Sequence, residues 1–422
     1  MVWHHFYTHL IKSRGGLVAQ SKVKKSKIRL RPKEKFNFFQ DQRVRSVFYQ
    51  LLTAGIVGWV LYYLASNTAH NLDMRGMSTG FGFFNTTAGF DTEFKLIEYT
   101  PGVGTYRDIF IIGALNTLLI SFFAIIASTI LGFFIGVLRL SKNWLVSNVA
   151  LAFVEVFRNT PLLIQIIFWF IGIFSLLPVV RKTIDLSFGA ETLLLNNRGL
   201  YFATPIFGNL FWLSALALFI AIIAVIIIKK RAHKIQDQTG EQKSTFLISL
   251  ALIVLLPIIT FFATGMPLKW DVPTLQGFNF QGGASLPPAF LALFVALSIY
   301  HAANIAEAVR AGILSVNKGQ TEAALSIGLE QDKVLGLVII PQAMPAIVPP
   351  MISNWMNTVK NSSLAVAIGY NDIVSLFMQT TLNQIGHAIE IVGLTMAFYM
   401  TISLIISGLL NIYNKRVQLV ER

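Results

Sequence analysis

The stretch IFIIGALNTLLISFFAIIAS, residues 109–128, is apolar on all sides and holds no charged residue. As a helix it is long enough to cross the roughly 30 Å hydrocarbon core of a bilayer. The strict alternation of polar and apolar residues that a membrane barrel requires is missing from it. A helix is the remaining choice, because lipid offers the backbone no hydrogen-bond partners. The stretch therefore predicts a helical membrane protein.

The composition agrees with this prediction. Of the 422 residues, 54% are hydrophobic and only 13% are charged, against about 25% charged in a typical soluble domain. We predict an all-α, polytopic fold with about eight transmembrane helices. The predicted spans are 46–65, 109–139, 150–178, 207–228, 245–264, 288–310, 345–368 and 390–413. The absence of cysteine excludes disulfides, thiolate metal sites and cysteine nucleophiles.

The net charge of +14 has two possible explanations, which are nucleic-acid binding and the bias of Lys and Arg toward the cytoplasmic side of a membrane. If the spans alternate, the basic tail 1–45, the link KKRAHKIQDQTGEQK at 229–243 and the other dense clusters all fall on one side. We therefore expect both termini to be cytoplasmic, with no nucleic-acid partner. The tail is also expected to contact anionic membrane lipid. Its opening MVWHHFYTHL is too short and polar for a cleavable signal peptide.

Polar residues within the spans concentrate in 109–178 and 288–422, which we predict to form the working core in two parts. The segment 46–108 adds a first span and an outward-facing loop. The insertion 179–287 adds two spans that are almost free of polar residues, as is typical of helices that face lipid. The chain has no GxxxxGK[ST] phosphate-binding loop, so ATP would be bound by another chain.

The segment from 307 to 350 carries the most specific motif: EAVRAGILSVNKGQTEAALSIGLEQDKVLGLVIIPQAMPAIVPP. It resembles the EAA signature of ABC importer permeases, through Glu322-Ala323-Ala324, then Gly328, then Pro341. Val and Ile stand at 338 and 340, where the signature has Ile and Leu, and both keep apolar bulk. Gly319-Gln320 and the stretches EAVRAG (307–312), FRNTPLLIQ (157–165) and VKNSSLA (359–365) resemble the polar amino-acid subfamily, including the longer general L-amino-acid permeases. The resemblance covers roughly 109–178 and 288–413.

The resemblance implies a type I permease subunit in a bacterial inner membrane, working by alternating access on L-amino acids of broad specificity. A periplasmic binding protein would deliver cargo against loops such as 66–107 and 369–389. A homodimer of ABC ATPase subunits would bind ATP and magnesium, so the permease itself would hold no cofactor, bind no metal and catalyse no reaction. A second homologous permease would complete a heterodimer.

The resemblance places the contact with the ATPase in the loop 311–344. We expect TEAALSI to form a short helix with Glu322 in its first turn, where the helix dipole favours an anion. Gly328 would end it in a left-handed conformation. By resemblance this is the coupling helix, and an ordinary turn helix is the alternative. The predicted coupling residues are Gly319, Gln320, Glu322, Ala323, Ala324 and Gly328.

Lys360 is the leading candidate for contact with the cargo, because a charged side chain within a span is energetically costly and usually has a function. It precedes Asn361, Ser362 and Ser363. A local break there would offer backbone N–H groups to a carboxylate. Alternatively, Lys360 pairs with a carboxylate of a neighbouring subunit. The resemblance implies acidic residues near this stretch in members that carry cationic cargo, and Trp355 and Asn361 stand there instead, which favours broad or neutral selectivity.

The remaining candidates have structural alternatives. Glu155 and Arg158 are three residues apart on a helix and can pair, and Pro161 is expected to bend the chain after them. Asn116 and Gln165 either contact cargo or join helices. Glu307 and Arg310 are expected to form a structural pair.

Three other functions remain open on the sequence alone. One is a different cargo, such as a cation or oxyanion, on the same scaffold. Another is ion-driven transport, which would need protonatable residues deep in the spans; His301 and His387 are predicted near span ends, and no Asp lies within a predicted span. A membrane enzyme would need a clustered acid–base or metal site, which we do not find.

Overall fold

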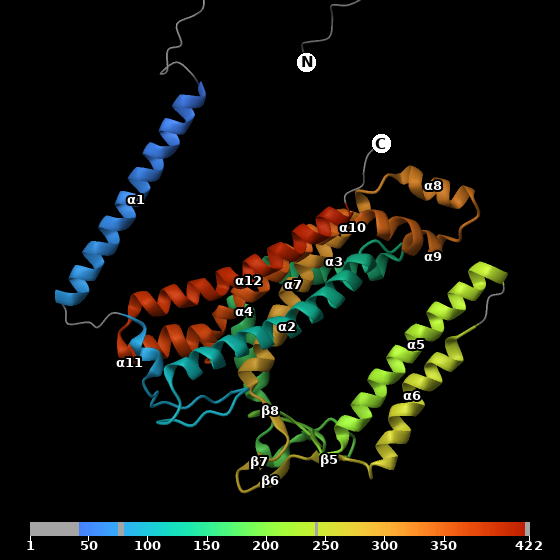
Figure 1. The fold of residues 1–422 in the computed structure, drawn as a ribbon, viewed down its shortest axis with the longest axis horizontal. Coiled ribbons are helices and arrows are strands. Elements are labelled where there is room, and N and C mark those ends of the chain that lie inside the picture. The colour runs from blue at the N-terminus through green and yellow to red at the C-terminus, as the bar shows by residue number, and fades with distance from the viewer. Residues whose placement is uncertain (1–41, 75–79, 241–243, 418–422) are drawn as a thin grey trace, which may run out of the picture. The chain divides into compact units, whose positions relative to one another are not determined.

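A computed structural model describes residues 42–74, 80–240 and 244–417 (Figure 1). The predicted roles of the basic tail fall almost entirely outside these residues. The chain divides into two units, the first ending at Met74 and the second starting at Arg75. The helices are α1 (Gln42–Met74), α2 (Tyr106–Leu138), α3 (Trp144–Asn159), α4 (Leu162–Ile167), α5 (Phe211–Thr239), α6 (Phe246–Ala263), α7 (Pro288–Leu314), α8 (Lys318–Ser326), α9 (Gln331–Val334), α10 (Ile340–Asn361), α11 (Leu382–Ile385) and α12 (Ala388–Val417).

The helical membrane fold is confirmed. Among the described residues, seven helices are long and apolar enough to cross a membrane, and a bent pair brings the number to eight if it counts as one span. That pair is the predicted span 150–178, which is not a single helix. Trp144–Asn159 and Leu162–Leu176 meet at 103°, because Pro161 between them cannot continue the backbone hydrogen bonding of α3. The predicted bend is thus present, and it breaks the span into two separate helices.

The two helices α2 and α7 pack side by side in the second unit (Figure 1). A Cβ atom added to Gly132 would lie 2.8 Å from the carbonyl oxygen of Ala302, and one added to Gly136 would lie 2.7 Å from that of Ala306. These glycines, spaced four apart, therefore let the two backbones approach closely. We did not predict this contact, although the spacing GFFIG at 132–136 is visible in the sequence.

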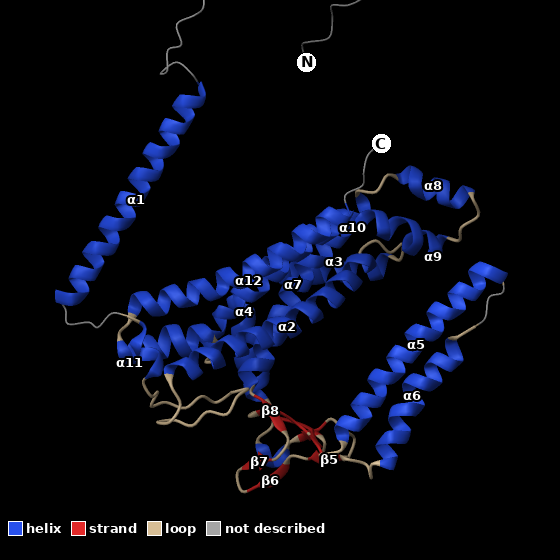
Figure 2. Ribbon diagram, viewed as in Figure 1, coloured by secondary structure: helices blue, strands red, loops and turns tan. Residues whose placement is uncertain are grey.

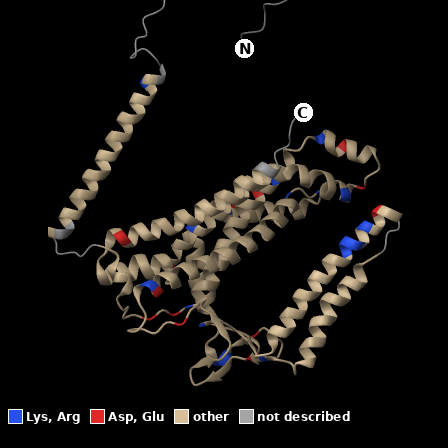
Figure 3. Cartoon of the chain, viewed as in Figure 1, with Lys and Arg blue, Asp and Glu red and all other residues tan. Residues whose placement is uncertain are grey.

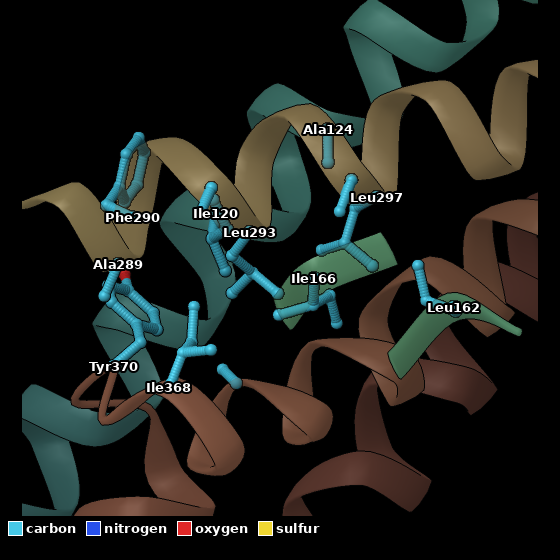
Figure 4. Close-up of a cluster of buried hydrophobic side chains, with 13 residues drawn as sticks. Ile120, Ala124, Leu162, Ile166, Ala289, Phe290, Leu293, Leu297, Ile368 and Tyr370 are labelled. Atoms are coloured by element: carbon cyan, nitrogen blue, oxygen red, sulfur yellow. The ribbon is translucent and has the colours of Figure 1, made fainter. Parts of the chain in front are cut away.

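A cluster of buried hydrophobic side chains joins α2, α4 and α7 to the segment after α10 (Figure 4). Ile120, Leu293 and Ile166 are fully buried in it. Tyr370 is also buried there, and its hydroxyl donates to the carbonyl oxygen of Asn116 at 3.0 Å. The chain after α10 is therefore anchored to the outer surface of the helix pair rather than free as a loop.

The insertion contains β structure that the all-α prediction missed (Figure 2). The strands are β1 (Ile184–Asp185), β2 (Leu193–Asn196), β3 (Gly199–Phe202), β4 (Thr204–Phe207), β5 (Leu268–Asp271), β6 (Thr274–Gln276), β7 (Asn279–Gln281) and β8 (Ala284–Leu286). All strand pairs are antiparallel. They form one four-stranded sheet of order β1-β2-β3-β8 and two two-stranded sheets, β4-β5 and β6-β7. Strands of two to four residues are too short for alternation to stand out in an apolar sequence.

Between β4 and β5 the chain forms the hairpin of α5 and α6. Buried small residues of α5, Ser214, Ala217 and Ala221, allow close packing on α6. Most of the remaining surface of both helices is exposed apolar side chains, as predicted for helices facing lipid. Helix α5 runs to Thr239, so most of the basic link predicted as a connection is helical.

The chain between α10 and α12 changes helix type several times. A 3-10 helix (Ser362–Ile368) follows α10, and a π-helix (Val374–Thr381) precedes α11. Asp372 lies between them and has no exposed surface. Its Oδ1 accepts a hydrogen bond from the backbone N–H of Ser375 at 2.8 Å. Burial raises the pKa of Asp372 to about 7.

Candidate functional site: a coupling helix and a polar helix face

The predicted coupling segment forms α8, although it begins earlier than expected. Asn317 is the N-cap, and its Oδ1 accepts from the backbone N–H of Gly319 at 2.8 Å. Glu322 is therefore the fifth residue of the helix, so the prediction that it lies in the first turn is wrong. Gly328 follows the end of α8 with φ +85°, as predicted for a left-handed helix end.

Helix α8 shows one surface to solvent and buries the other. Ala324 is buried against a cluster that includes Val334 and Ile339, whereas Glu322 and Ala323 are exposed. The amide of Gln342 on α10 donates to Oε1 of Gln320 at 3.2 Å, which links α8 to the helix that follows the loop. The exposed surface is thus held in a defined position by contacts within the chain.

Two apolar residues that we did not predict belong to this exposed surface. Ile327 has 79% of its surface exposed and Leu325 has 42%. Large apolar side chains exposed on a short helix outside the spans are typical of a protein contact. Their signal in the sequence was weak, because apolar residues near a helix end normally pack inward.

A second feature is the polar face of α10, which we define by Ser353, Asn357 and Lys360. All three are exposed, and the intervening Thr358 and Val359 are buried. Their spacing of four and three places them on one side of the helix. This side continues through Pro350 and Ala346, which are also exposed.

The neighbouring polar residues are engaged in contacts that hold this face. The indole Nε1 of Trp355 donates to Oγ1 of Thr129 on α2 at 2.9 Å. The amide Nδ2 of Asn361 lies 3.3 Å from Nε2 of His301. The hydroxyls of Ser362 and Ser363 donate to backbone carbonyls three residues earlier, each at 2.7 Å. These contacts are intramolecular and leave Lys360 as the exposed charge of the face.

The local break that would have offered backbone N–H groups beside Lys360 is absent. Lys360 lies in the last turn of α10, and the chain continues directly into the 3-10 helix Ser362–Ile368. The backbone N–H of Ser362 still has carbonyl partners at Thr358 and Lys360. The helix is tightened rather than opened, so no free backbone N–H groups face an anion at this point.

A cavity of about 340 Å³ lies beside the N-terminal part of this face. Ala346, Pro350 and Asn354 of α10 line it together with Arg158 and Glu307. Glu307 accepts from Arg310 at 2.7 Å and also pairs with Arg139, so the expected pair is confirmed and is part of a larger ionic group. The polar face of α10 therefore leads to a charged cavity.

The pair predicted between Glu155 and Arg158 does not form. Oε2 of Glu155 accepts from Nδ2 of Asn159 at 2.9 Å, while Arg158 lines the cavity beside Glu307. A spacing of three residues within α3 permitted the pair, but Glu155 bonds instead to the residue four positions later. Figure 3 shows how few charged residues the long helices of the bundle carry besides these.

Asn116 and Gln165 are buried and hold helices together. Nδ2 of Asn116 donates to the carbonyl oxygens of Phe94 and Asn371, at 2.9 and 2.8 Å. Nε2 of Gln165 donates to those of Phe157 and Thr160, at 2.8 and 2.9 Å, across the bend between α3 and α4. In both cases the amide satisfies carbonyls that an interrupted backbone leaves free.

Of the two histidines predicted near span ends, one lies elsewhere. His301 lies midway along α7 and is 1% exposed, so a protonatable group does lie deep in a span. His387 precedes α12, as expected, and its ring packs 4.8 Å from that of Phe83, centroid to centroid. Among the described residues no group of three or more His, Asp or Glu side chains could hold a metal ion.

Comparison with known proteins identifies the family. Residues 231–419 match the family described as "Binding-protein-dependent transport system inner membrane component". The putative amino-acid ABC transporter permease protein YhdX of Escherichia coli is 46% identical, over 91% of this chain and 97% of that protein. The general L-amino acid transport system permease protein AapQ of Rhizobium johnstonii is 45% identical, over 90% and 94%.

A third relative is the glutamate/glutamine/aspartate/asparagine transport system permease protein BztB of Rhodobacter capsulatus. It is 38% identical to this chain, over 90% of this chain and 96% of that protein. Such coverage includes the additional spans and the strand-containing insertion as well as the core. Membership excludes a membrane enzyme and implies an ATPase subunit and a binding protein as partners. The chain belongs to the family of amino-acid ABC transporter permeases, the multi-pass inner-membrane components of ABC importers.

Proposed function

We propose that this permease imports L-amino acids of broad specificity, with the polar face of α10 lining their path. The relatives named above are described as amino-acid, general L-amino-acid and acidic-amino-acid or amide transporters. The observation that carries the proposal is the exposure of Ser353, Asn357 and Lys360 within a segment whose length and hydropathy suit a membrane span. A charged and polar helix surface at that depth is not stable against lipid.

The same exposure supports a second permease as the partner of this chain. Another protein must cover the polar face or enclose water beside it. A sibling permease presenting its own polar face would form such a path between the two chains. Lys360 would then meet the carboxylate of a passing amino acid, or a carboxylate of the sibling.

We place both termini and α8 in the cytoplasm, where the ATPase binds nucleotide. The dense basic clusters support this orientation through the excess of Lys and Arg in cytoplasmic loops. Glu322, Ala323 and Ile327 then form the exposed surface that meets the ATPase. ATP and magnesium act through that subunit, and the permease responds because its two states bind its partners with different affinities.

The cargo is tested by uptake of labelled amino acids into proteoliposomes that contain the complete transporter. We expect uptake of several L-amino acids, and Lys360→Met should raise the KM for anionic amino acids. The matched control is Lys269→Met, an exposed lysine on strand β5. Transport of a cation or an oxyanion, with no uptake of any amino acid, would overturn the proposed cargo.

Coupling is tested with Glu322→Arg. We expect ATP hydrolysis to continue while amino-acid uptake is lost, because a reversed charge disturbs the contact between α8 and the ATPase. Glu93→Arg, at an exposed glutamate in the segment that precedes α2, is the control. Normal uptake by Glu322→Arg would contradict the proposed role of Glu322 in coupling. Uptake that continues with an inactive ATPase subunit would favour ion-driven transport.

A further inference from the structure

A cavity of about 610 Å³ lies at the end of the bundle where α8 joins the long helices. The ends of α2 and α7 form one side, and α8, α9 and the π-helical turn Leu335–Ile339 form the other. Its walls are mainly aliphatic, with Leu140, Ile313, Val316 and Val334 among them. The residues that define the polar face of α10 and the exposed surface of α8 do not line this cavity.

Two cations border the cavity. Nζ of Lys142 donates to Oε1 of Gln331 on α9 at 3.2 Å, and Lys318 begins α8. Both lysines are exposed. No described carboxylate lines the cavity beside them. The site therefore combines positive charge at its rim with an apolar interior, which fits an amphipathic anion.

Neighbouring residues indicate that the cavity opens at the membrane surface. Trp144 and Leu145, just after Lys142, have 76% and 62% of their surfaces exposed. Exposed tryptophan is typical of the headgroup level of a membrane. Leu314, on the wall of the cavity, is 59% exposed, so the apolar interior reaches the exposed surface at the end of α7.

We propose that this cavity binds an anionic phospholipid, with its phosphate on Lys142 and Lys318 and one acyl chain among the aliphatic walls. The assignment to the cytoplasmic leaflet rests on the orientation proposed above. Basic pockets between membrane helices on that side are suited to anionic headgroups. Because the walls come from both the long helices and the α8–α9 loop, the lipid braces the coupling helix against the bundle.

The headgroup contact is tested on the complete transporter in nanodiscs of phosphatidylcholine, with or without phosphatidylglycerol. We expect the wild-type complex to retain phosphatidylglycerol through purification and to hydrolyse ATP faster with it. Lys142→Gln with Lys318→Gln should weaken retention about fivefold for each lysine lost. The matched control, Lys229→Gln with Lys230→Gln, removes two lysines of α5 and should keep both responses.

The acyl chain is tested with a fluorophore attached to an introduced cysteine, which is the only cysteine of this chain because the native sequence has none; this permease is labelled before it is assembled with its partners. A label on Leu140→Cys should be quenched by phosphatidylglycerol brominated on its chains, and more weakly by brominated phosphatidylcholine at equal content. Equal quenching by the two lipids would overturn the specific site.

The double variant also separates lipid from protein as the occupant. If it loses the ATPase subunit while its lipid retention is unchanged, the cavity belongs to the ATPase interface and the proposal is wrong. Lipid retention is measured without cargo. A transporter that failed to import amino acids would therefore disprove the proposed cargo and leave this inference standing.

Discussion

The hydroxyl oxygen of Thr117 on α2 accepts a hydrogen bond from the backbone N–H of Ile373 at 3.1 Å, and both residues are buried. The same hydroxyl donates to the carbonyl oxygen of Gly113 at 2.8 Å. One side chain thereby satisfies a backbone donor at the turn between two irregular helices. This contact, with the close approach of Gly113 to Ile373, fixes the segment after α10 on α2.

Thr117→Val should destabilise the protein by about 1–3 kcal/mol, because the N–H of Ile373 loses its partner in a buried position. The apparent melting temperature of the purified permease would report the loss. Thr401→Val is the control, since the hydroxyl of Thr401 is exposed and bonds within its own helix to Ala397 at 2.8 Å. Equal melting temperatures for both variants would show that the bond does not hold the segment.

Gly132→Ala should cost about 1–3 kcal/mol, because the added methyl group meets the backbone of α7 and the helices must separate. Gly136→Ala should behave in the same way. A glycine in open space, Gly408 on α12, has nothing within 4 Å of an added Cβ. Gly408→Ala should therefore be neutral or slightly stabilising. The yield of folded protein and its melting temperature distinguish these outcomes, and an unaffected Gly132→Ala would contradict the close contact.

Gly328→Val should impair coupling through backbone conformation rather than through a clash. The φ of +85° is unfavourable for a β-branched residue, while no atom lies within 4 Å of an added Cβ. We expect valine to raise the free energy of this backbone conformation by about 1–2 kcal/mol relative to glycine, and asparagine to raise it less. Transport per ATP hydrolysed is the measurement. If Asn and Val variants were equally impaired, side-chain size rather than backbone strain would be responsible.

Asp372→Asn should change how stability depends on pH. Burial raises the pKa of Asp372 from 3.8 to about 7, so the folded protein keeps this proton while the unfolded chain releases it. The stability contributed by the protonated carboxyl is therefore lost as pH rises from about 4 to about 7. Asn keeps an oxygen for the N–H of Ser375 and has no proton to lose.

Melting temperatures measured between about pH 5 and about pH 8 should show a smaller decline for Asp372→Asn than for the wild type. Asp91→Asn is the control. Its carboxylate accepts from the backbone N–H of Thr92, which lowers the pKa of Asp91, so the change should matter only at lower pH. Parallel curves for Asp372→Asn and the wild type would show that Asp372 is ionised in the folded protein.

The candidate site illustrates how far sequence patterns reach. The short helix α8, its left-handed end at Gly328 and the ion pair of Glu307 with Arg310 are local features, and they were predictable because their partners lie within a few residues. The pair of Glu155 with Arg158 was equally local, yet it is absent, because Glu155 accepts from Asn159 and Arg158 lines the cavity with Glu307. Ile327 was missed because apolar character alone does not say whether a side chain packs inward.

The sequence by itself determined the membrane class, the family motif and every span except 150–178, because long apolar runs and a contiguous signature need no knowledge of neighbours. Only the tertiary structure decided which polar residues hold helices together and which remain exposed. Asn116 and Lys360 are both polar residues within predicted spans. The amide of Asn116 is buried and donates to the backbone carbonyls of Phe94 and Asn371. The side chain of Lys360 is exposed, and none of the described segments covers it. That difference arises from packing between segments far apart in the chain, which no local pattern records.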